Sequence, residues 1–310
     1  MEQDFLDWLL PRLPPDPRLE VGPGDDAAVL RPPAGRRTVV SVDMLTEGVD
    51  FRLGPDGAAP RRVGHKALAV GLSDLAAMAA RPEAAVVAVC LPRVGGDSLA
   101  RGIAAGITAL AAGFDVVIAG GDTNAWDGPL VVSVTVLGSV APGRCWRRDG
   151  ARPGDVLVAT GGFGGSILGR HLDVRPRCAE AAWIAERFAV HAAIDVSDGL
   201  SLDLSRLVRA SNAGAILDLP AVPIHPDAVR LADTDGVNAL EHALADGEDF
   251  ELLMALPPAA AADLLAAPRP FATPLTRIGT VTVGPGLSAR STDGRVAPLT
   301  PRGFLHAFEG

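Results

Sequence analysis

Apolar and polar positions follow two different periods along the first half of the chain. Runs rich in β-branched residues predict strands at residues 37–45, 84–92, 114–122 and 129–140. Longer segments with apolar positions at helical spacing predict one helix or two short ones at 64–80, and a helix at 98–113 that ends at Gly113. This succession predicts mixed α/β structure.

Residues 141–155 interrupt this pattern with proline, glycine and a basic cluster, which is typical of a linker. The chain has 310 residues, about twice the length of a usual domain, so we expect two domains, 1–141 and 147–310. In the second, residues 156–169 predict a strand, a glycine turn and a helix. Residues 191–195 predict a strand that leads into an amphipathic helix, with Gly214 beyond its end and one apolar face made by Leu200, Leu204, Leu207 and Val208.

Charge and composition exclude several classes of protein. The chain has 28 basic and 37 acidic residues, and no arginine cluster with interleaved aromatic residues, so we expect no nucleic-acid partner. The acidic N-terminus is unlike a signal peptide, and no apolar stretch is long enough to span a bilayer, so we expect a cytoplasmic protein without a membrane partner. Three separated cysteines without a CxxC motif predict buried free thiols rather than a zinc site or disulfides.

Aspartates recur where an apolar run meets small residues. Each occurrence alone is weak evidence, because Ser197 and Asp198 could cap the following helix and the Gly-Asp pairs could form turns. Asp74 differs, because it is the only charge between Lys66 and Arg81 and a helix would place it on an apolar face. Burying such a carboxylate requires a partner. The complete set comprises Asp25, Asp26, Asp43, Asp74, Asp122, Asp195 and Asp198.

A cluster of these acids would need cations to be stable. Two carboxylates about 4 Å apart repel by roughly 4 kcal/mol at an effective dielectric constant of about 20. The chain has a single lysine, and Mg²⁺ is the cation that is usually shared between carboxylates and phosphates. Neither a Walker A motif nor the protein-kinase motifs are present. The glycine-rich residues 160–166 could either approach a phosphate with bare backbone or form a tight turn.

Seven motifs in fixed order carry a family resemblance. They are GDDAAVL, SVDMLTEGVDF, HKALAVGLSDLAAMAA, GGDT, RRDGARPGD, AIDVSDGL and GEDFELL, with a faint further match in GFLHAF near the end. In this order they resemble the thiamine-monophosphate kinases, a family within the aminoimidazole ribonucleotide synthetase-like superfamily. The resemblance implies an α/β (α+β) two-domain fold, with an N-terminal sheet domain that dimerises and a C-terminal α/β domain that completes the active site.

The resemblance also implies a reaction and its residues. The reaction is the conversion of thiamine monophosphate to the diphosphate with ATP and Mg²⁺, by a homodimer, with Asp122, Arg148 and Asp198 as catalytic residues. ATP would contact Gly121, Asp122, Arg148 and Ser197, and the thiamine end would contact Asp50, Glu248 and Phe304. The metal ligands would be Asp26, Ser41, the backbone of Val42, Asp43, Asp74, Asp122, Asp195 and Asp198.

Some positions depart from the family pattern and leave alternatives open. Asp50 stands where histidine is common, DGEDFEL replaces GGEDYEL, and Ala104 stands where an aromatic side chain could stack on adenine. One alternative is another ATP-dependent enzyme of the superfamily, although selenophosphate synthesis would need a reactive cysteine near the N-terminus and the first is Cys90. The other is a Mg-nucleotide-binding protein without catalysis. The absence of an obvious general base agrees with a phosphate acceptor, which is already mostly dianionic at neutral pH.

Overall fold

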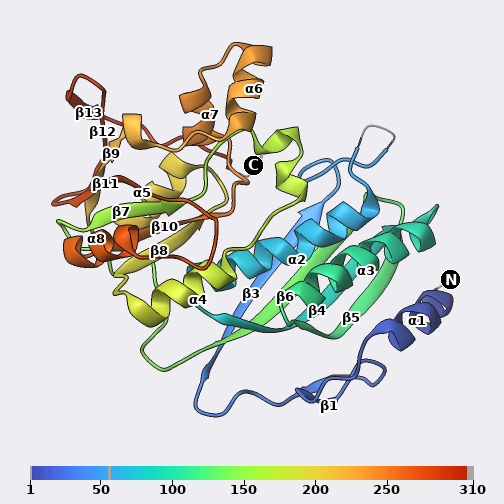
Figure 1. Cartoon of the computed structure of the whole chain (residues 1–310). Coiled ribbons are helices and arrows are strands. Elements are labelled where there is room, and N and C mark those ends of the chain that lie inside the picture. Colours follow the sequence, from blue (N-terminus) through green and yellow to red (C-terminus); the bar gives the residue numbers. More distant parts are fainter. Residues whose placement is uncertain (1, 55–56, 306–310) are drawn as a thin grey trace. The chain divides into compact units, whose positions relative to one another are not determined.

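The computed structural model describes residues 2–54 and 57–305, and this part of the chain divides into two compact units. The first contains most of the chain up to Gly143 together with Leu172–Arg175. The second contains Ala76–Ala79, Arg144–His171 and most of the chain from Pro176 onward. The main boundary between them falls between Gly143 and Arg144, and each unit has its own sheet (Figure 1). Within the described residues, no helix combines the length and the apolar character needed to cross a membrane.

The first unit is built on a four-stranded sheet in the order β3-β6-β4-β5. β4 and β5 are parallel and are joined by a helix, α3, whereas β6 is antiparallel to both β3 and β4. The strands are β3 (Arg37–Thr46), β4 (Arg81–Pro92), β5 (Val117–Trp126) and β6 (Val131–Val140). The other elements are α1 (Glu2–Leu9), η1 (Leu10–Arg12), β1 (Leu19–Val21), β2 (Val29–Leu30), α2 (Pro60–Ala77) and α3 (Gly96–Gly113).

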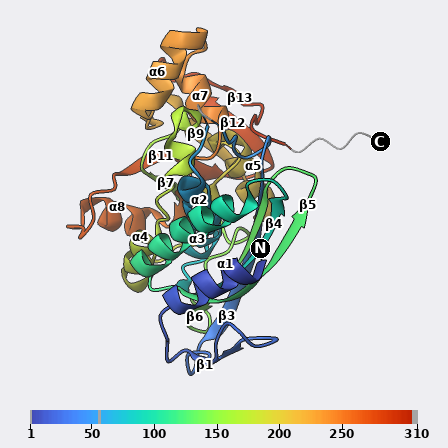
Figure 2. The same cartoon turned by 90° about the vertical axis from the view of Figure 1, so that its right-hand side faces the viewer.

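One face of this sheet is covered by α2 and α3, which lie side by side (Figure 2). Glycines allow the two helix backbones to approach closely, since a Cβ at Gly64 would lie 2.1 Å from the carbonyl oxygen of Ile103. Side chains alternate along β6 and β3, so Val132, Val134 and Val136 of β6 are fully buried, while Val40 and Val42 of β3 are exposed. The exposed set on β3 is Val40, Val42 and Met44.

The second unit is built on a seven-stranded sheet in the order β13-β12-β9-β11-β7-β10-β8, in which only β12 and β9 pair in parallel. Its strands are β7 (Val156–Thr160), β8 (Ala192–Val196), β9 (Gly214–Asp218), β10 (Glu251–Leu256), β11 (Leu275–Thr282), β12 (Gly286–Arg290) and β13 (Val296–Pro298). Its helices are α4 (Cys178–Arg187), α5 (Leu200–Ala210), α6 (Pro226–Asp235), α7 (Ala239–Ala245) and α8 (Pro258–Ala266), with 3-10 turns η2 (Ser166–Leu168), η3 (Arg170–Leu172) and η4 (Leu219–Ala221).

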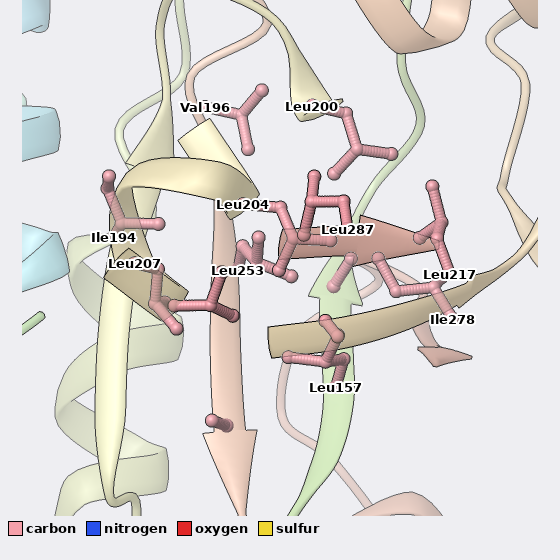
Figure 3. Packing of buried hydrophobic residues seen from close by; sticks show 14 of the residues in the cluster. Leu157, Ile194, Val196, Leu200, Leu204, Leu207, Leu217, Leu253, Ile278 and Leu287 are labelled. Atoms are coloured by element: carbon pink, nitrogen blue, oxygen red, sulfur yellow. The ribbon is translucent and has the colours of Figure 1, made fainter. Parts of the chain in front are cut away.

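The core of this unit lies between the sheet and α5. The apolar face of α5 packs Leu200, Leu204 and Leu207 against sheet residues that include Leu157 and Leu253 (Figure 3). All five of these leucines are fully buried. Burying a leucine side chain contributes about 1.5–3 kcal/mol, so this face of α5 fixes the start of the helix and the segment that precedes it.

Most of the predicted elements are confirmed, with three differences. The expected helix after the glycine turn at 161–165 is wrong, because the chain forms the short 3-10 turns η2 and η3 instead. β5 continues past Asp122 to Trp126, so Asp122 lies within the strand rather than at its end. α2 begins at Pro60 and ends at Ala77, after which Ala79 adopts a positive φ of 53° that an α-helix cannot include.

Candidate functional site

Two of the expected metal ligands form a close acidic pair in the first unit. Asp43 on β3 faces α2 at Gly71, where a Cβ would lie 3.5 Å from the Asp43 carboxylate. Burial, together with the nearby charge of Asp74, raises the pKa of Asp43 to about 7. Asp43 Oδ2 is buried without a hydrogen-bond partner among the described residues. An unpartnered carboxylate oxygen beside a second carboxylate is the arrangement that a hard cation would stabilise.

Ser41 completes this pair. It lies two residues before Asp43 on the same face of β3, and its Oγ donates a hydrogen bond to the Asp74 carboxylate. Val42 lies between them with its side chain exposed on the opposite face. The described residues contain no group of three or more His, Cys, Asp or Glu side chains arranged to hold a metal ion. The complete set of metal ligands expected from the sequence therefore stays a prediction.

A cavity of about 660 Å³ in the first unit brings together Asp26, Gly121 and Asp122. Its remaining lining is mainly apolar and comes mostly from α1, α3, β4, β5 and residues 22–30, with Leu10, Leu13 and Leu137 beside them. Gly121 is required by the sheet, because a Cβ there would lie 2.1 Å from the carbonyl oxygen of Val87. The cavity lies within the 300–1,000 Å³ range of small-molecule sites and combines an apolar wall with three carboxylates, those of Asp25, Asp26 and Asp122.

Asp122 and the Asp43–Asp74 pair are separated within the sheet. Asp122 lies on β5 and Asp43 on β3, which are the two edge strands of this sheet. Adjacent strands are about 4.8 Å apart, so these edges are roughly 14 Å apart. The sequence places all three residues in one metal cluster, but this sheet does not bring Asp122 beside the other two.

Asp50 is held in a loop that follows β3. Its carboxylate accepts a hydrogen bond from the Thr46 backbone N–H at 2.7 Å, and its carbonyl oxygen accepts one from Lys66 Nζ, also at 2.7 Å. Lys66, on α2, is fully buried. The only lysine of the chain therefore fixes the backbone at a residue expected to contact substrate. Sequence reasoning did not assign Lys66 a role, although a single lysine in an apolar helix was a usable signal.

Four expected site residues lie together in the second unit. The Glu248 N–H donates to the Ser197 carbonyl oxygen at 2.6 Å, and the Phe304 N–H donates to the Asp198 carbonyl oxygen at 2.9 Å. Gly303 permits the second contact, because a Cβ there would lie 2.1 Å from the same Asp198 oxygen. Three segments that are distant in sequence thus converge where β8 leads into α5.

The charge of Asp198 is compensated by an arginine. Arg206, two turns along α5, forms an ion pair with Asp198 and with the buried Asp203. Burial raises the pKa of Asp203, while its hydrogen bond from the Asp198 N–H and the charge of Arg206 act in the opposite direction. Neither Ser197 nor Asp198 caps α5 with its side chain, because Gly199 occupies the N-cap. Asp203 and Arg206 were not identified from the sequence.

Asp195 and Arg148 also belong to the second unit. Asp195 lies on β8 opposite Leu252 and is only 4% exposed. Arg148 is exposed in the segment that precedes β7, and its carbonyl oxygen accepts a hydrogen bond from Ser211 Oγ at 2.7 Å. The neighbouring Arg147 forms an ion pair with Asp149, whereas Arg148 forms none within the described residues. Its guanidinium is thus available to a ligand.

The glycine-rich segment is a structural turn. The N–H of Gly164 donates to Asp249 at 3.0 Å and that of Gly165 donates to Asp246 at 2.8 Å. Both glycines have positive φ, and a Cβ on either would lie less than 3 Å from the backbone of α6 or α7. Because carboxylates of the same chain occupy these two amides, the structure favours the tight-turn interpretation over the phosphate-binding one.

Comparison with known proteins agrees with this architecture. The model described as AIR synthase related protein, N-terminal domain, matches residues 24–140, and the corresponding C-terminal domain matches residues 152–291. Thiamine-monophosphate kinase of Rhodopirellula baltica is 42% identical over 99% of this chain and 97% of its own.

Solved structures show the same likeness. The thiamine-monophosphate kinase of Stenotrophomonas maltophilia superposes with a TM-score of 0.81 at 33% identity, over 94% of this chain and 97% of that one. AaThiL complexed with AMPPCP and TMP superposes with a TM-score of 0.76 at 26% identity, over 90% of each chain. The chain therefore belongs to the AIR synthase related family, and within it to the group of the thiamine-monophosphate kinases.

Proposed function

We propose that this protein transfers the γ-phosphoryl group of ATP to thiamine monophosphate, which yields thiamine diphosphate and ADP. The observation that carries the proposal is the similarity to thiamine-monophosphate kinases over nearly the whole chain, together with the relative that binds AMPPCP and TMP. The cytoplasmic location expected from the sequence stays a prediction.

The nucleotide is assigned to the cavity of the first unit. Its apolar lining suits a purine base, and Asp26, Gly121 and Asp122 supply a polar region for the phosphates. Gly121 contributes only backbone atoms to this region. The exposed guanidinium of Arg148 and the segment at Ser197 complete the set of nucleotide contacts that we propose.

Two of the proposed Mg²⁺ ligands, Asp43 and Asp74, form an arrangement that suits a hard cation. The buried, unpartnered Asp43 Oδ2 lies beside the charge of Asp74, and oxygen is the only donor type in the proposed set. When bound, Mg²⁺ would neutralise phosphate charge that develops during phosphoryl transfer. The ligands that we propose are Asp26, Ser41, the Val42 backbone, Asp43, Asp74, Asp122, Asp195 and Asp198.

The residues of this chain act by positioning and by electrostatics. The acceptor phosphate is mostly dianionic near neutral pH, so its oxygen can attack without a general base. Arg148 would stabilise charge on the transferring group, and Asp50, Glu248 and Phe304 would orient the thiamine end. The backbones of all three are held by hydrogen bonds: Lys66 donates to the Asp50 carbonyl oxygen, and the Glu248 and Phe304 amides donate to the carbonyl oxygens of Ser197 and Asp198.

We also propose that the protein is a homodimer formed through the sheet of the first unit. Val40, Val42 and Met44 are each 60–63% exposed and lie on one face of β3. Three large apolar side chains in a row on an uncovered sheet face are typical of an interface. A second copy would remove this face from water.

An assay with purified protein tests the proposed function. Thiamine monophosphate with MgATP should give thiamine diphosphate and ADP, whereas free thiamine should be a poor acceptor because its hydroxyl must lose a proton and the proposed site provides no base for it. Efficient phosphorylation of thiamine with no turnover of the monophosphate would contradict the proposal.

A further inference from the structure

The apolar part of the cavity contains one hydroxyl group in its helical walls. α1 and α3 line the cavity with aliphatic and aromatic side chains, among them Phe5, Leu9, Ile103 and Ile107. Of the described residues that these two helices contribute, Thr108 is the only one with a polar side chain. The other polar side chains of the lining come from residues 22–26 and from β5.

Thr108 and Asp122 lie at different levels along the same cavity. α3 connects two parallel strands, so it runs antiparallel to β5 and its last turns lie near the start of that strand. Ile118, at the start of β5, lines the cavity as well, and Asp122 lies four residues, or about 13 Å, further along the strand. A nucleotide with its phosphates near Asp122 would therefore direct its base toward Thr108.

The proton of the Thr108 hydroxyl already takes part in a hydrogen bond within α3. Thr108 Oγ1 donates to the Ala104 carbonyl oxygen at 2.8 Å, one helical turn earlier, with a longer approach of 3.4 Å to that of Ala105. A hydroxyl has one proton and two lone pairs, so this oxygen presents acceptor sites to the cavity. It can accept from an amino group but meets a carbonyl oxygen with repulsion.

Adenine and hypoxanthine differ in this property. Adenine carries an amino donor at position 6, where hypoxanthine and guanine carry a carbonyl oxygen, and the aliphatic walls contact all three rings alike. We propose that Thr108 is a specificity-determining residue that accepts a hydrogen bond from the 6-amino group of adenine and so selects ATP over 6-oxopurine nucleotides. This inference rests on the proposed function for the place of the phosphates, and it adds the residue that recognises the base.

Nucleotide specificity of the whole chain tests this inference. The experiment measures kcat/KM with MgATP and with Mg-inosine triphosphate, which differs from ATP only in the 6-oxo group and the resulting N1 proton. Replacing Thr108 by Val keeps the side-chain shape and removes the acceptor. A neutral hydrogen bond corresponds to about a 2- to 10-fold effect, so T108V should lower the preference for ATP over inosine triphosphate by about that factor, mainly through a higher KM for ATP.

Two further variants serve as controls. T108S keeps the hydroxyl and should retain the preference. T234V removes a similar bond within α6, from Thr234 Oγ1 to the Arg230 carbonyl oxygen, on an exposed helix outside the cavity, and should leave the ratio unchanged. Thermal melts check that all three variants are folded. An ATP preference that is the same in T108V and wild type would overturn the inference.

Binding measurements separate this inference from the proposed function. Dissociation constants of non-hydrolysable ATP and inosine triphosphate analogues with Mg²⁺ report the base preference without any acceptor. If T108V changes the ratio of these constants while thiamine monophosphate is not phosphorylated, the inference stands and the proposed function is wrong. If phosphorylation occurs and the ratio does not change with T108V, the proposed function stands and the inference is wrong.

Discussion

Asp43 shows how a single side chain can lower stability while it prepares a site. Its carboxylate is buried beside that of Asp74, and one oxygen has no partner among the described residues. Such a group costs free energy in the metal-free protein, which a bound cation would offset. Asp155 is the opposite case. It is 3% exposed, but it accepts the Arg152 N–H at 2.8 Å and pairs with His191.

Asparagine substitution should separate these two kinds of buried acid. We expect Asp43→Asn, without Mg²⁺ at pH 8, to keep or raise the melting temperature, because it relieves repulsion, and about 1 kcal/mol corresponds to roughly 2–4 °C here. Its kinase activity should fall by about 10²-fold or more, since charge at the phosphoryl group loses its compensation. Asp155→Asn should instead melt lower and retain activity. Melts with and without MgATP provide the measurement, and a destabilised but active Asp43→Asn protein would contradict the metal assignment.

Two adjacent arginines provide a matched comparison for the nucleotide contact. Arg147 is engaged by Asp149, whereas the Arg148 guanidinium is exposed. We expect Arg148→Ala to lower kcat/KM by about 10²–10³-fold, because the variant loses a charge that, in the proposed site, would face the phosphates in the transition state. Arg147→Ala should change it by less than about threefold. Steady-state kinetics decide between them, and equal losses would show that the contact is misplaced.

At this scale the sequence identified acids but not their partners. Asp74 was correctly singled out as a carboxylate on an apolar helix, because one-dimensional spacing is enough to show that. The ion pair of Asp198 with Arg206 depends on how the chain turns from β8 into α5, and the bond from Lys66 to the Asp50 carbonyl oxygen depends on how the loop after β3 lies against α2. The Asp203–Arg206 ion pair could have been predicted from helix spacing, because residues three apart lie on the same face of a helix. Nothing in the sequence showed that Asp203 would be buried.

At the scale of elements, the turn at 161–165 controls how α6 and α7 pack. Its glycines contact the backbones of both helices, and the segment that looked like the start of a helix is held instead as 3-10 turns. The sequence indicated strand, glycine turn and helix, and it was wrong on the helix because the carboxylates that capture the Gly164 and Gly165 amides lie about 80 residues away. The secondary-structure propensity of a short segment contains no information about a contact with residues so far along the chain.

Alanine substitutions should show this packing directly. At Gly165, φ is +71° and a Cβ would lie 2.3 Å from the Asp227 carbonyl carbon, whereas at Gly162 the nearest atom is 3.4 Å away. We expect Gly165→Ala to lower the free energy of unfolding by about 2–4 kcal/mol, from strained backbone and overpacking together. Gly162→Ala should cost less than about 1 kcal/mol. Urea denaturation measures both, and equal costs would contradict a turn held by contact with α6.

His242 makes the stability of the α6–α7 pair depend on pH. It is 6% exposed, and its ring nitrogens contact Asp246 at 2.9 Å and Asp235 at 3.3 Å. Burial lowers its pKa, but the hydrogen bonds and charges of the two carboxylates outweigh burial and raise the pKa above 6.5. A raised pKa in the folded state means that this contribution is complete below pH 6.5 and is lost as the pH rises through the folded value.

We therefore expect the free energy of unfolding to fall between pH 6 and pH 9 by more in wild type than in His242→Gln. The reason is that glutamine carries no charge to lose. His65→Gln is the control, because His65 contacts the Val174 carbonyl oxygen rather than a carboxylate, and this variant should keep the wild-type slope. Chemical denaturation over the pH series measures the slopes, and identical slopes for wild type and His242→Gln would rule out the pairing.

At the scale of the whole molecule, alternation predicted the strands well and the ordered motifs predicted the family. What the sequence could not supply is where each acid lies across a sheet. Asp43 and Asp122 are both acids on apolar strands, yet strand order places them at opposite edges, and that order results from the β4–α3–β5 crossover and the pairing of β6 between β3 and β4. The expected metal ligands of this sheet therefore lie farther apart than their similar sequence motifs suggest.

The strand order of this sheet and the exposed apolar face of its edge strand β3 lead to a prediction about dimer formation. Val40 is 60% exposed on the face that we assign to the dimer, and Val94, which is 90% exposed, lies outside that sheet. We expect the Val40→Asp variant to sediment as a monomer and the wild type as a dimer, because a desolvated carboxylate in an apolar interface has no partner. Val94→Asp, with the same chemical change, should remain dimeric. A Val40→Asp protein that stays dimeric at low micromolar concentration would show that the two copies associate through another surface.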